Sequence, residues 1–310
     1  MTDPAKGQDR NMPLSMEKKY GAGGPAAVRQ GTLWGDVVRR FSRNRAAMLG
    51  LIILVLMITY SVVGPWIRPY GYADLDWSIA YQLPNVQHWF GTDMFGRDLF
   101  VRTAMGGRVS LLIAFSATGV VLSIGVLYGS LAGFLGGRTD NVMMRIIDVL
   151  YGLPYLPFAI ILLVILGSGI APMLLALAFV SWLTPARLVR GQILTLKENE
   201  YVEAARALGA SRRRLVTRHL LPNTFGIIVI AMFLEVPGMI LGEAFLSFLG
   251  LGISAPDASW GTLAQEGWQG FRSHPWLIML PGIFIAVTVI SFNFVGDGFR
   301  DAIDPRTKET

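Results

Sequence analysis

Two glutamates inside a long apolar stretch are the first residues whose chemistry calls for an explanation. They are Glu235 and Glu243, and Pro237 follows the first of them by two residues. Ionising a carboxylate away from water is costly, so each side chain is expected to face a protein interior or a water-filled path. A proline within a helix also frees a backbone carbonyl. We therefore take Glu235, Glu243 and Pro237 as candidates to line such a path.

Both glutamates also have a structural alternative. Glu235 is equally well explained as a protonated or hydrogen-bonded side chain at a subunit interface. Glu243 lies nearer the end of the apolar stretch, where an outer gate or simple packing is the first interpretation. Replacing Glu235 with Gln should alter the activity without loss of assembly if the side chain lines a path.

A second group of charges alternates in sign within a polar segment. Asp93, Arg97 and Asp98 are predicted to fold their loop through mutual hydrogen bonds. We expect these pairs to be exposed, and exposed ion pairs contribute little stability individually. The alternative is that the cluster contacts another protein.

The third charged segment is the loop 197–223, which interrupts the apolar stretches. Its first part, 200–208, contains strong helix formers with two glutamates in the first turn, where the helix dipole favours negative charge. Gly209 then suits a helix end, and Ser211 can cap a second, basic helix. The apolar positions at helical spacing in the first helix are Tyr201, Ala204, Ala205 and Leu208.

The first helix of this loop has a small, alanine-rich face that favours docking to another protein. The alternative is an interfacial helix lying on lipid, as basic amphipathic segments often do. Glu203 either pairs with a basic residue of a partner or stabilises its own helix N-terminus. The three arginines 212–214 are better explained by anionic lipid headgroups than by a specific protein contact.

The apolar stretches themselves predict a helical protein that crosses a bilayer. The 310 residues are 53% hydrophobic and 15% charged, whereas soluble domains carry roughly 25% charged residues. A membrane-spanning helix needs about 20 mostly apolar residues. Six segments meet this requirement: 46–66, 109–135, 143–166, 172–196, 224–250 and 276–295.

The distribution of basic residues sets the expected orientation. With both termini inside, 22 of the 27 Lys and Arg residues lie on the cytoplasmic side, as membrane proteins prefer. The same asymmetry explains the net charge of +6 without a nucleic-acid partner. The predicted organisation is a cytoplasmic tail (1–45), a six-span domain (46–297) with an outer segment (67–108) and the cytoplasmic loop 197–223, and a second cytoplasmic tail (298–310).

Several kinds of chemistry find no support in the sequence. There is no cysteine, and the three histidines are too far apart to suggest a metal site. No G-x-x-x-x-G-K-S/T or G-x-S-x-G motif occurs, so neither ATP hydrolysis by this chain nor a serine hydrolase is expected. Gly125, Gly129 and Gly133 are spaced by four residues, which favours close packing of another helix.

The loop 197–223 also carries a family resemblance. Glu203-Ala204-Ala205, then Gly209, then Leu221-Pro222 resembles the EAA motif of the membrane subunits of ABC importers. Across 34–306 the chain is similar to the C-type permeases of the dipeptide and oligopeptide branch. Further motifs that carry this likeness are Arg40-Phe41, Asn44-Arg45-Ala46, Gly91-Thr92-Asp93, Gly96-Arg97-Asp98, Gly107-Arg108, Val189-Arg190-Gly191, Leu246-Ser247-Phe248-Leu249-Gly250, Ser259-Trp260-Gly261 and Gly296-Asp297-Gly298.

This resemblance implies an all-α, polytopic fold with six transmembrane helices, that of type I ABC importer permeases (MetI-like), in a bacterial inner membrane. It implies a homologous second permease subunit, two cytoplasmic ATPase subunits that bind the ATP and Mg²⁺, and an extracytoplasmic binding protein that delivers a peptide. By the same resemblance Tyr201, Glu203, Ala204, Ala205, Leu208, Gly209 and Pro222 would couple the chain to an ATPase. Asp93, Arg97 and Asp98 would then face the binding protein if they face any partner.

Two alternatives stay open at this point. Nickel and glutathione importers belong to the same branch, so the cargo need not be a peptide. An ion-coupled secondary transporter is an alternative of another class, but it would need ion-coupling groups in two related halves, and only Glu235 is a strong candidate.

Overall fold

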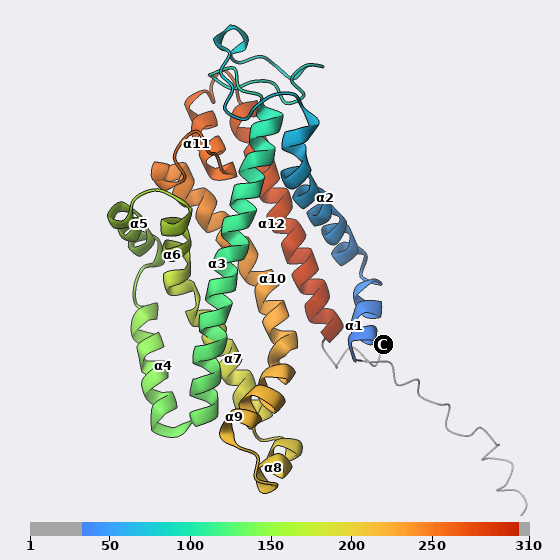
Figure 1. Cartoon of the computed structure of the whole chain (residues 1–310), viewed down its shortest axis with the longest axis vertical. Helices are drawn as coiled ribbons and strands as arrows, with labels where there is room; N and C mark the ends of the chain where they lie inside the picture. Colours follow the sequence, from blue (N-terminus) through green and yellow to red (C-terminus); the bar gives the residue numbers. More distant parts are fainter. Residues whose placement is uncertain (1–32, 304–310) are drawn as a thin grey trace, which may run out of the picture.

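The computed structural model describes residues 33–303, and over that range the regular structure is helical, without a β-strand. Long helices run side by side along the molecule (Figure 1). The segment 68–98 closes one end, and a short helix, α8 (Glu200–Ala207), extends from the other. We name these the outer end and the inner end. The residues 1–32 and 304–310, most of the two predicted tails, lie outside the described part.

Four helices are long and apolar enough to cross a membrane. They are α2 (Arg45–Ile67), α3 (Leu99–Leu135), α12 (Trp276–Ile303) and the continuous run Arg212–Leu251, which comprises α9 (Arg212–Arg214), η2 (Leu215–Leu220), α10 (Leu221–Leu246) and η3 (Ser247–Leu251).

Two further spans are each broken into a pair of helices. The first pair, α4 (Gly137–Tyr151) and α5 (Tyr155–Leu166), bends by 81°. The second, α6 (Ile170–Ser181) and α7 (Leu183–Leu196), bends by 45°. The six predicted spans are therefore found if each pair counts as one, but the third and fourth are not single helices.

Prolines explain both breaks. Pro154 disfavours a helical conformation at the residue before it, and the break lies between Tyr151 and Tyr155. Pro185 has no N–H to donate to the carbonyl of Ser181, the residue at which α6 ends. The sequence contains both prolines, but the apolar runs around them predict two continuous spans.

Several predicted boundaries are also corrected. The second span begins at Leu99 rather than 109, because Asp98 caps α3 by accepting a hydrogen bond from the backbone N–H of Val101 at 2.9 Å. The first predicted tail contains α1 (Leu33–Phe41), and α12 continues past 297 into the second. The other outer connection contains α11 (Trp260–Gln269).

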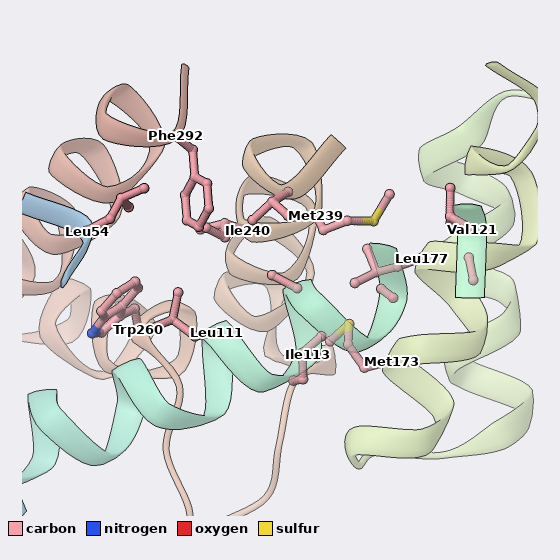
Figure 2. Packing of buried hydrophobic residues seen from close by; sticks show 14 of the residues in the cluster. Leu54, Leu111, Ile113, Val121, Met173, Leu177, Met239, Ile240, Trp260 and Phe292 are labelled. Carbon is pink, nitrogen blue, oxygen red and sulfur yellow. The ribbon is translucent and has the colours of Figure 1, made fainter. Parts of the chain in front are cut away.

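Buried apolar side chains join the long helices around α3. Figure 2 shows Trp260 and Phe292 at one side of this core and Met173 and Leu177 at the other. Many large apolar side chains elsewhere on these helices are exposed, such as Leu56 on α2. An exposed apolar surface of this extent suits contact with lipid.

The glycines of α3 allow a close contact with another helix. A β-carbon at Gly125 would lie 2.7 Å from the Cβ of Pro185, and one at Gly129 would overlap the carbonyl oxygen of Ala186. Gly133 faces Ile193 in the same way. The predicted role of this stripe in packing is confirmed, and its partner is α7.

Candidate coupling and pathway sites

The inner loop has the predicted helix–glycine–helix form. The helix α8 ends at Ala207, and Gly209 takes a φ of +82°, which favours glycine. The N–H of Ala210 donates to the carbonyl of Ala205 at 3.0 Å, which closes the turn. Ser211 then accepts a hydrogen bond from the N–H of Arg214 at 3.4 Å and caps the basic helix.

The predicted apolar face of α8 is split between two surfaces. Val202, which the pattern missed, is fully buried against Val189 and Leu215, and the partly buried Ala205 packs beside it. The side chains that remain exposed at the predicted positions are Tyr201, Glu203, Ala204 and Leu208. Leu208 is 89% exposed, so the free surface of α8 is apolar at its tip. Ala205 therefore positions α8 rather than presenting a surface to a partner.

Pro222 lies in the first turn of α10 and has no N–H to donate to the helical turn before it. It is exposed and follows directly after the π-helical turn η2. The chain thus runs from α8 through the glycine turn into α10 without a flexible linker.

The three pathway candidates of α10 lie in different environments. Glu235 is half-buried, one helical turn from Gly238. Gly238 lines an apolar cavity of about 560 Å³ that is largely open to the outside. Leu241 and Phe245 of the same helix, Tyr155 of α5, and parts of α11 and α12 also line it. Glu235 therefore stands at the edge of a surface that a solute or a partner subunit could reach.

Glu243 and Pro237, by contrast, are buried inside the chain. Ser110 donates to Oε2 of Glu243 at 2.8 Å, and Ser247 donates to Oε1 at 2.6 Å. The backbone N–H of Trp260 donates to the Ser110 hydroxyl at 3.1 Å. Glu243 thus joins α3, α10 and α11, and of its predicted roles the geometry supports packing. The pathway assignment of Glu243 and Pro237 is corrected, because neither side chain reaches a surface.

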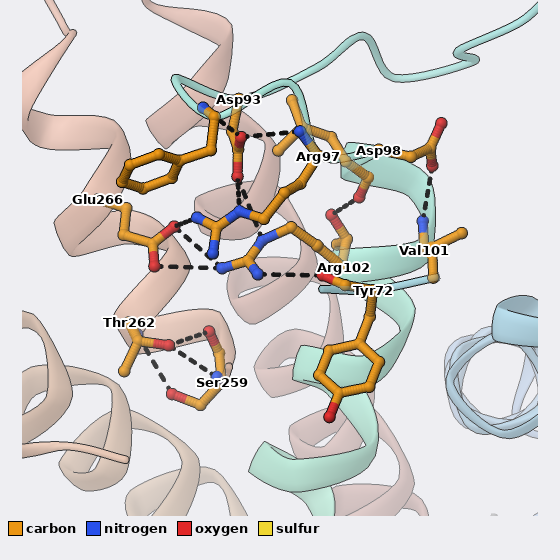
Figure 3. A network of polar contacts seen from close by, with 12 residues as sticks. Tyr72, Asp93, Arg97, Asp98, Val101, Arg102, Ser259, Thr262 and Glu266 are labelled. Atoms are coloured by element: carbon orange, nitrogen blue, oxygen red, sulfur yellow. Dashed lines mark hydrogen bonds and ion pairs between the residues drawn. The ribbon is translucent and has the colours of Figure 1, made fainter. Parts of the chain in front are cut away.

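The charged cluster of the outer end is buried rather than exposed, contrary to the sequence-based expectation (Figure 3). Asp93 accepts a hydrogen bond from Nε of Arg97 at 2.6 Å, and Nη2 of Arg97 donates to Glu266 at 2.8 Å. Arg102, which is 1% exposed, also binds Glu266, at 3.0 Å. Together these contacts join the 68–98 segment, α3 and α11.

Asp98 was predicted to share this network, but it is not part of it. It accepts from Val101 at the start of α3 and lies 2.8 Å from Nδ1 of His88. At the outer surface, hydrogen bonds from Ser78 hold the pKa of Asp76 below its usual range, so this exposed carboxylate stays charged. No group of His, Asp or Glu in the described residues could hold a metal ion.

The long apolar helices form a bundle in which two spans are broken, and a helix–turn–helix extends from one end. These features define a multi-pass membrane protein. Residues 125–309 match the family of binding-protein-dependent transport system inner membrane components. Residues 32–84 match the N-terminal TM domain of oligopeptide transport permease C. The chain belongs to the family of binding-protein-dependent transport system inner membrane components, and it is a permease subunit of an ABC importer.

Curated relatives resemble the chain over nearly its whole length. It is 45% identical over 279 residues to the oligopeptide transport system permease protein OppC of Haemophilus influenzae, covering 89% of this chain and 90% of that one. It is 46% identical over 274 residues to the dipeptide transport system permease protein DppC of Bacillus subtilis, covering 88% and 86%.

A solved structure supports the fold. The inward-facing MetNI methionine ABC transporter matches with a TM-score of 0.50 and 18% identity, covering 64% of this chain and 94% of that chain. At this identity the likeness concerns the fold alone. The predicted type I importer permease (MetI-like) fold is confirmed.

Proposed function

We propose that the chain forms, with a homologous second permease, the pathway of an ATP-driven importer for oligopeptides or dipeptides. An outer binding protein would deliver the peptide. The names of the curated relatives, at 45–46% identity over most of both chains, support this class of cargo above nickel or glutathione. The family supports ATP-driven import above an ion-coupled transporter.

The observation that carries the coupling part of the proposal is the exposed tip of α8. Tyr201, Ala204 and Leu208 lie on its free surface, whereas Val202 holds its other face against the bundle. A helix that is fixed to the spans yet offers a small apolar surface suits docking into a cleft of an ATPase subunit. Glu203 is exposed beside this surface, where it can pair with a cation of that subunit.

The pathway part of the proposal rests on the apolar cavity between α5, α10 and α11. It is open on one side, and Gly238 has open space above its α-carbon. A second permease placed against this side would close the cavity into a path between two subunits. Glu235, at its edge, would then be the polar group closest to a passing peptide.

ATP and Mg²⁺ would be bound by the partner ATPase subunits, and this chain would catalyse no reaction itself. It would lie in the bacterial inner membrane with both termini and α8 in the cytoplasm, in keeping with the basic residues at that end. The outer network of Asp93 and Arg97 would shape the surface that receives the binding protein.

The docking assignment is tested by Ala204→Trp and Leu208→Asp in the assembled transporter. Both should release the ATPase subunits on purification and abolish ATP-driven peptide uptake, because they obstruct the free surface of α8. Thr139→Trp is the matched control, since Thr139 is exposed on another helix of the inner end. Normal ATPase association in both α8 variants would refute the docking role.

The cargo is tested with the same wild-type transporter in proteoliposomes. Labelled di-, tri- and pentapeptides are supplied with the binding protein, and unlabelled peptide, glutathione or nickel is added as competitor. We expect competition by peptides alone. Uptake of nickel or glutathione, with none of peptide, would refute the proposed cargo and leave the docking of α8 standing.

A further inference from the structure

The two broken spans are joined to each other at and below their breaks. The break between α4 and α5 lies next to the break between α6 and α7, because the hydroxyl of Tyr151 and Oγ1 of Thr184 are 2.7 Å apart. The guanidinium of Arg187 lies 4.4 Å from the centre of the Tyr151 ring. The inner halves of the two spans, α4 and α7, therefore meet directly beneath the two bends.

Two ion pairs connect these inner halves. Arg190 of α7 donates Nε and Nη2 to the two carboxylate oxygens of Asp140 on α4, at 2.5 and 2.6 Å. One or two turns above, Arg187 donates to Asp148 at 2.5 Å. Asp140 is 6% exposed, whereas both members of the second pair are about half exposed. We name the two pairs together the α4–α7 clamp.

Below the bend the clamp is one of three links that hold α4. Ile147 also packs against Leu183 and Ala186 of α7, and the hydroxyl of Tyr128 on α3 donates to the carbonyl of Met143 at 2.8 Å. Only Asp140 and Ile147 of the fifteen residues of α4 are buried, and Val142, Ile146 and Val149 are exposed. Apolar packing therefore holds α4 weakly. Asp140 is buried and Arg190 is partly exposed, and a bidentate Arg–carboxylate pair fixes the relative direction of two helices, which apolar contacts do not.

The same α7 is fixed to α8. Backbone hydrogen bonds continue through the joint, from Lys197 to Ile193 at 3.0 Å and from Val202 to Asn199 at 2.9 Å. Val202 is then buried against Val189 and Ile193 of α7. A displacement of α8 must therefore carry α7 with it.

We propose that Asp140 and Arg190 are positioning residues that transmit the motion of α8 to α5 and hence to the apolar cavity. The helices α8, α7 and α4 move as one unit together with the inner half of α3, which packs on α7 through Gly129 and Gly133. The 81° bend between α4 and α5 is the hinge through which this unit moves the cavity wall at Tyr155. The proposal rests on the docking role given to α8 above. A route of this kind needs a direct test of coupling between its ends.

The first test compares Asp140→Asn, Arg190→Lys and the charge-swapped pair Asp140→Arg with Arg190→Asp, in the assembled transporter in proteoliposomes. We expect Asp140→Asn to keep the ATPases bound and hydrolysing, while peptide uptake per ATP falls by about tenfold. Arg190→Lys should give a smaller loss, because the ammonium keeps the positive charge although it cannot bind both oxygens. The swapped pair should recover a large part of the ratio.

The matched control is Asp36→Asn, which removes the exposed pair of Asp36 with Arg39 within α1, 3.5 Å apart. It should leave the ratio unchanged. An unchanged ratio in both Asp140→Asn and Arg190→Lys would overturn the proposal. The wild type and the α8 variants test the proposed function instead. Their ATPase binding and peptide uptake are therefore judged apart from the results for Asp140 and Arg190.

The second test measures the unit directly. The chain has no cysteine, so spin labels can be placed at single introduced cysteines without background. Labels at Val142 of α4 and Leu188 of α7, both exposed, should keep one distance through the ATP cycle in the wild-type transporter. The distance distribution should broaden in Asp140→Asn and narrow again in the swapped pair. A distance that changes with ATP in the wild type would exclude a single unit.

Discussion

The outer and inner ends of the bundle hold their charged side chains in different ways. At the outer end Arg97 and Arg102 share Glu266, and Asp93 joins them, so three segments of the chain meet in one buried network (Figure 3). At the inner end the α4–α7 clamp joins only two helices, and its second pair is half exposed. A network of several partners holds one arrangement, whereas two pairs between two helices can tilt together.

This difference matches what each end has to do in the proposed transporter. The outer end keeps a surface in shape, because Tyr72, α3 and α11 are all held through Arg102. The inner end would receive a displacement from the ATPases and pass it on. Substitutions at the two ends test this difference, because their effects on stability should differ.

The largest effect on stability is expected at the outer end, for Glu266→Ala. This change leaves the buried Arg97 and Arg102 with only Asp93 to balance two charges, and an uncompensated buried charge costs about 4 kcal/mol. Thermal unfolding in detergent micelles measures it. Asp257→Ala, at an exposed acidic residue in the same outer connection, is the control and should be near neutral. A loss below about 1 kcal/mol would show that the network does not hold the outer end.

The second effect tests the packing of α3 against α7, beside the clamp. Gly129→Leu forces a side chain into the backbone of α7 at Ala186, and overpacking of this kind costs about 3 kcal/mol. Gly119→Leu is the matched control on the same helix, since a β-carbon there meets no atom within 4 Å. Folded yield and unfolding temperature should fall for Gly129→Leu alone. Equal stability of the two variants would mean that α3 and α7 are not in close contact.

These two predictions show what the sequence could and could not reveal. The stripe of Gly125, Gly129 and Gly133 predicts close packing from local spacing alone. The Gly209 turn was likewise predictable, because helix formers, a glycine and a capping serine follow one another within a few residues. Features of this kind depend on neighbours in the sequence.

The buried networks depend on residues far apart in the chain. Glu266 lies 164 residues from Arg102, and Ser110 lies 133 residues from Glu243. No local pattern indicates these partners, so Asp93 and Arg97 were expected to be exposed and Glu243 was placed in a pathway. On α8, the apolar pattern did not separate the side that packs through Val202 from the free side of Leu208.

The third effect belongs to the buried pair of the clamp. Asp140→Asn removes one charged partner, while Arg190 stays partly in contact with solvent, so we expect a loss of about 1.5 kcal/mol. This is well below the effect of Glu266→Ala, although its effect on coupling should be larger. Unfolding and peptide uptake per ATP, measured on the same preparations, test whether stability and coupling separate at the two ends. If Glu266→Ala lowered peptide uptake per ATP in proportion to its loss of stability, the two ends would not differ in this way.

The smallest effect is expected for Arg187→Gln, which breaks the half-exposed pair with Asp148. Exposed pairs contribute about 0.5 kcal/mol and are weakened by salt, so the unfolding temperature should change little. The pair nonetheless lies beside the contact of Tyr151 with Thr184, at the two bends. Raising the salt concentration should therefore lower peptide uptake per ATP slightly in the wild type and not at all in Arg187→Gln. A salt effect of equal size in both would place the sensitive pair elsewhere and leave Asp140 and Arg190 as the whole of the clamp.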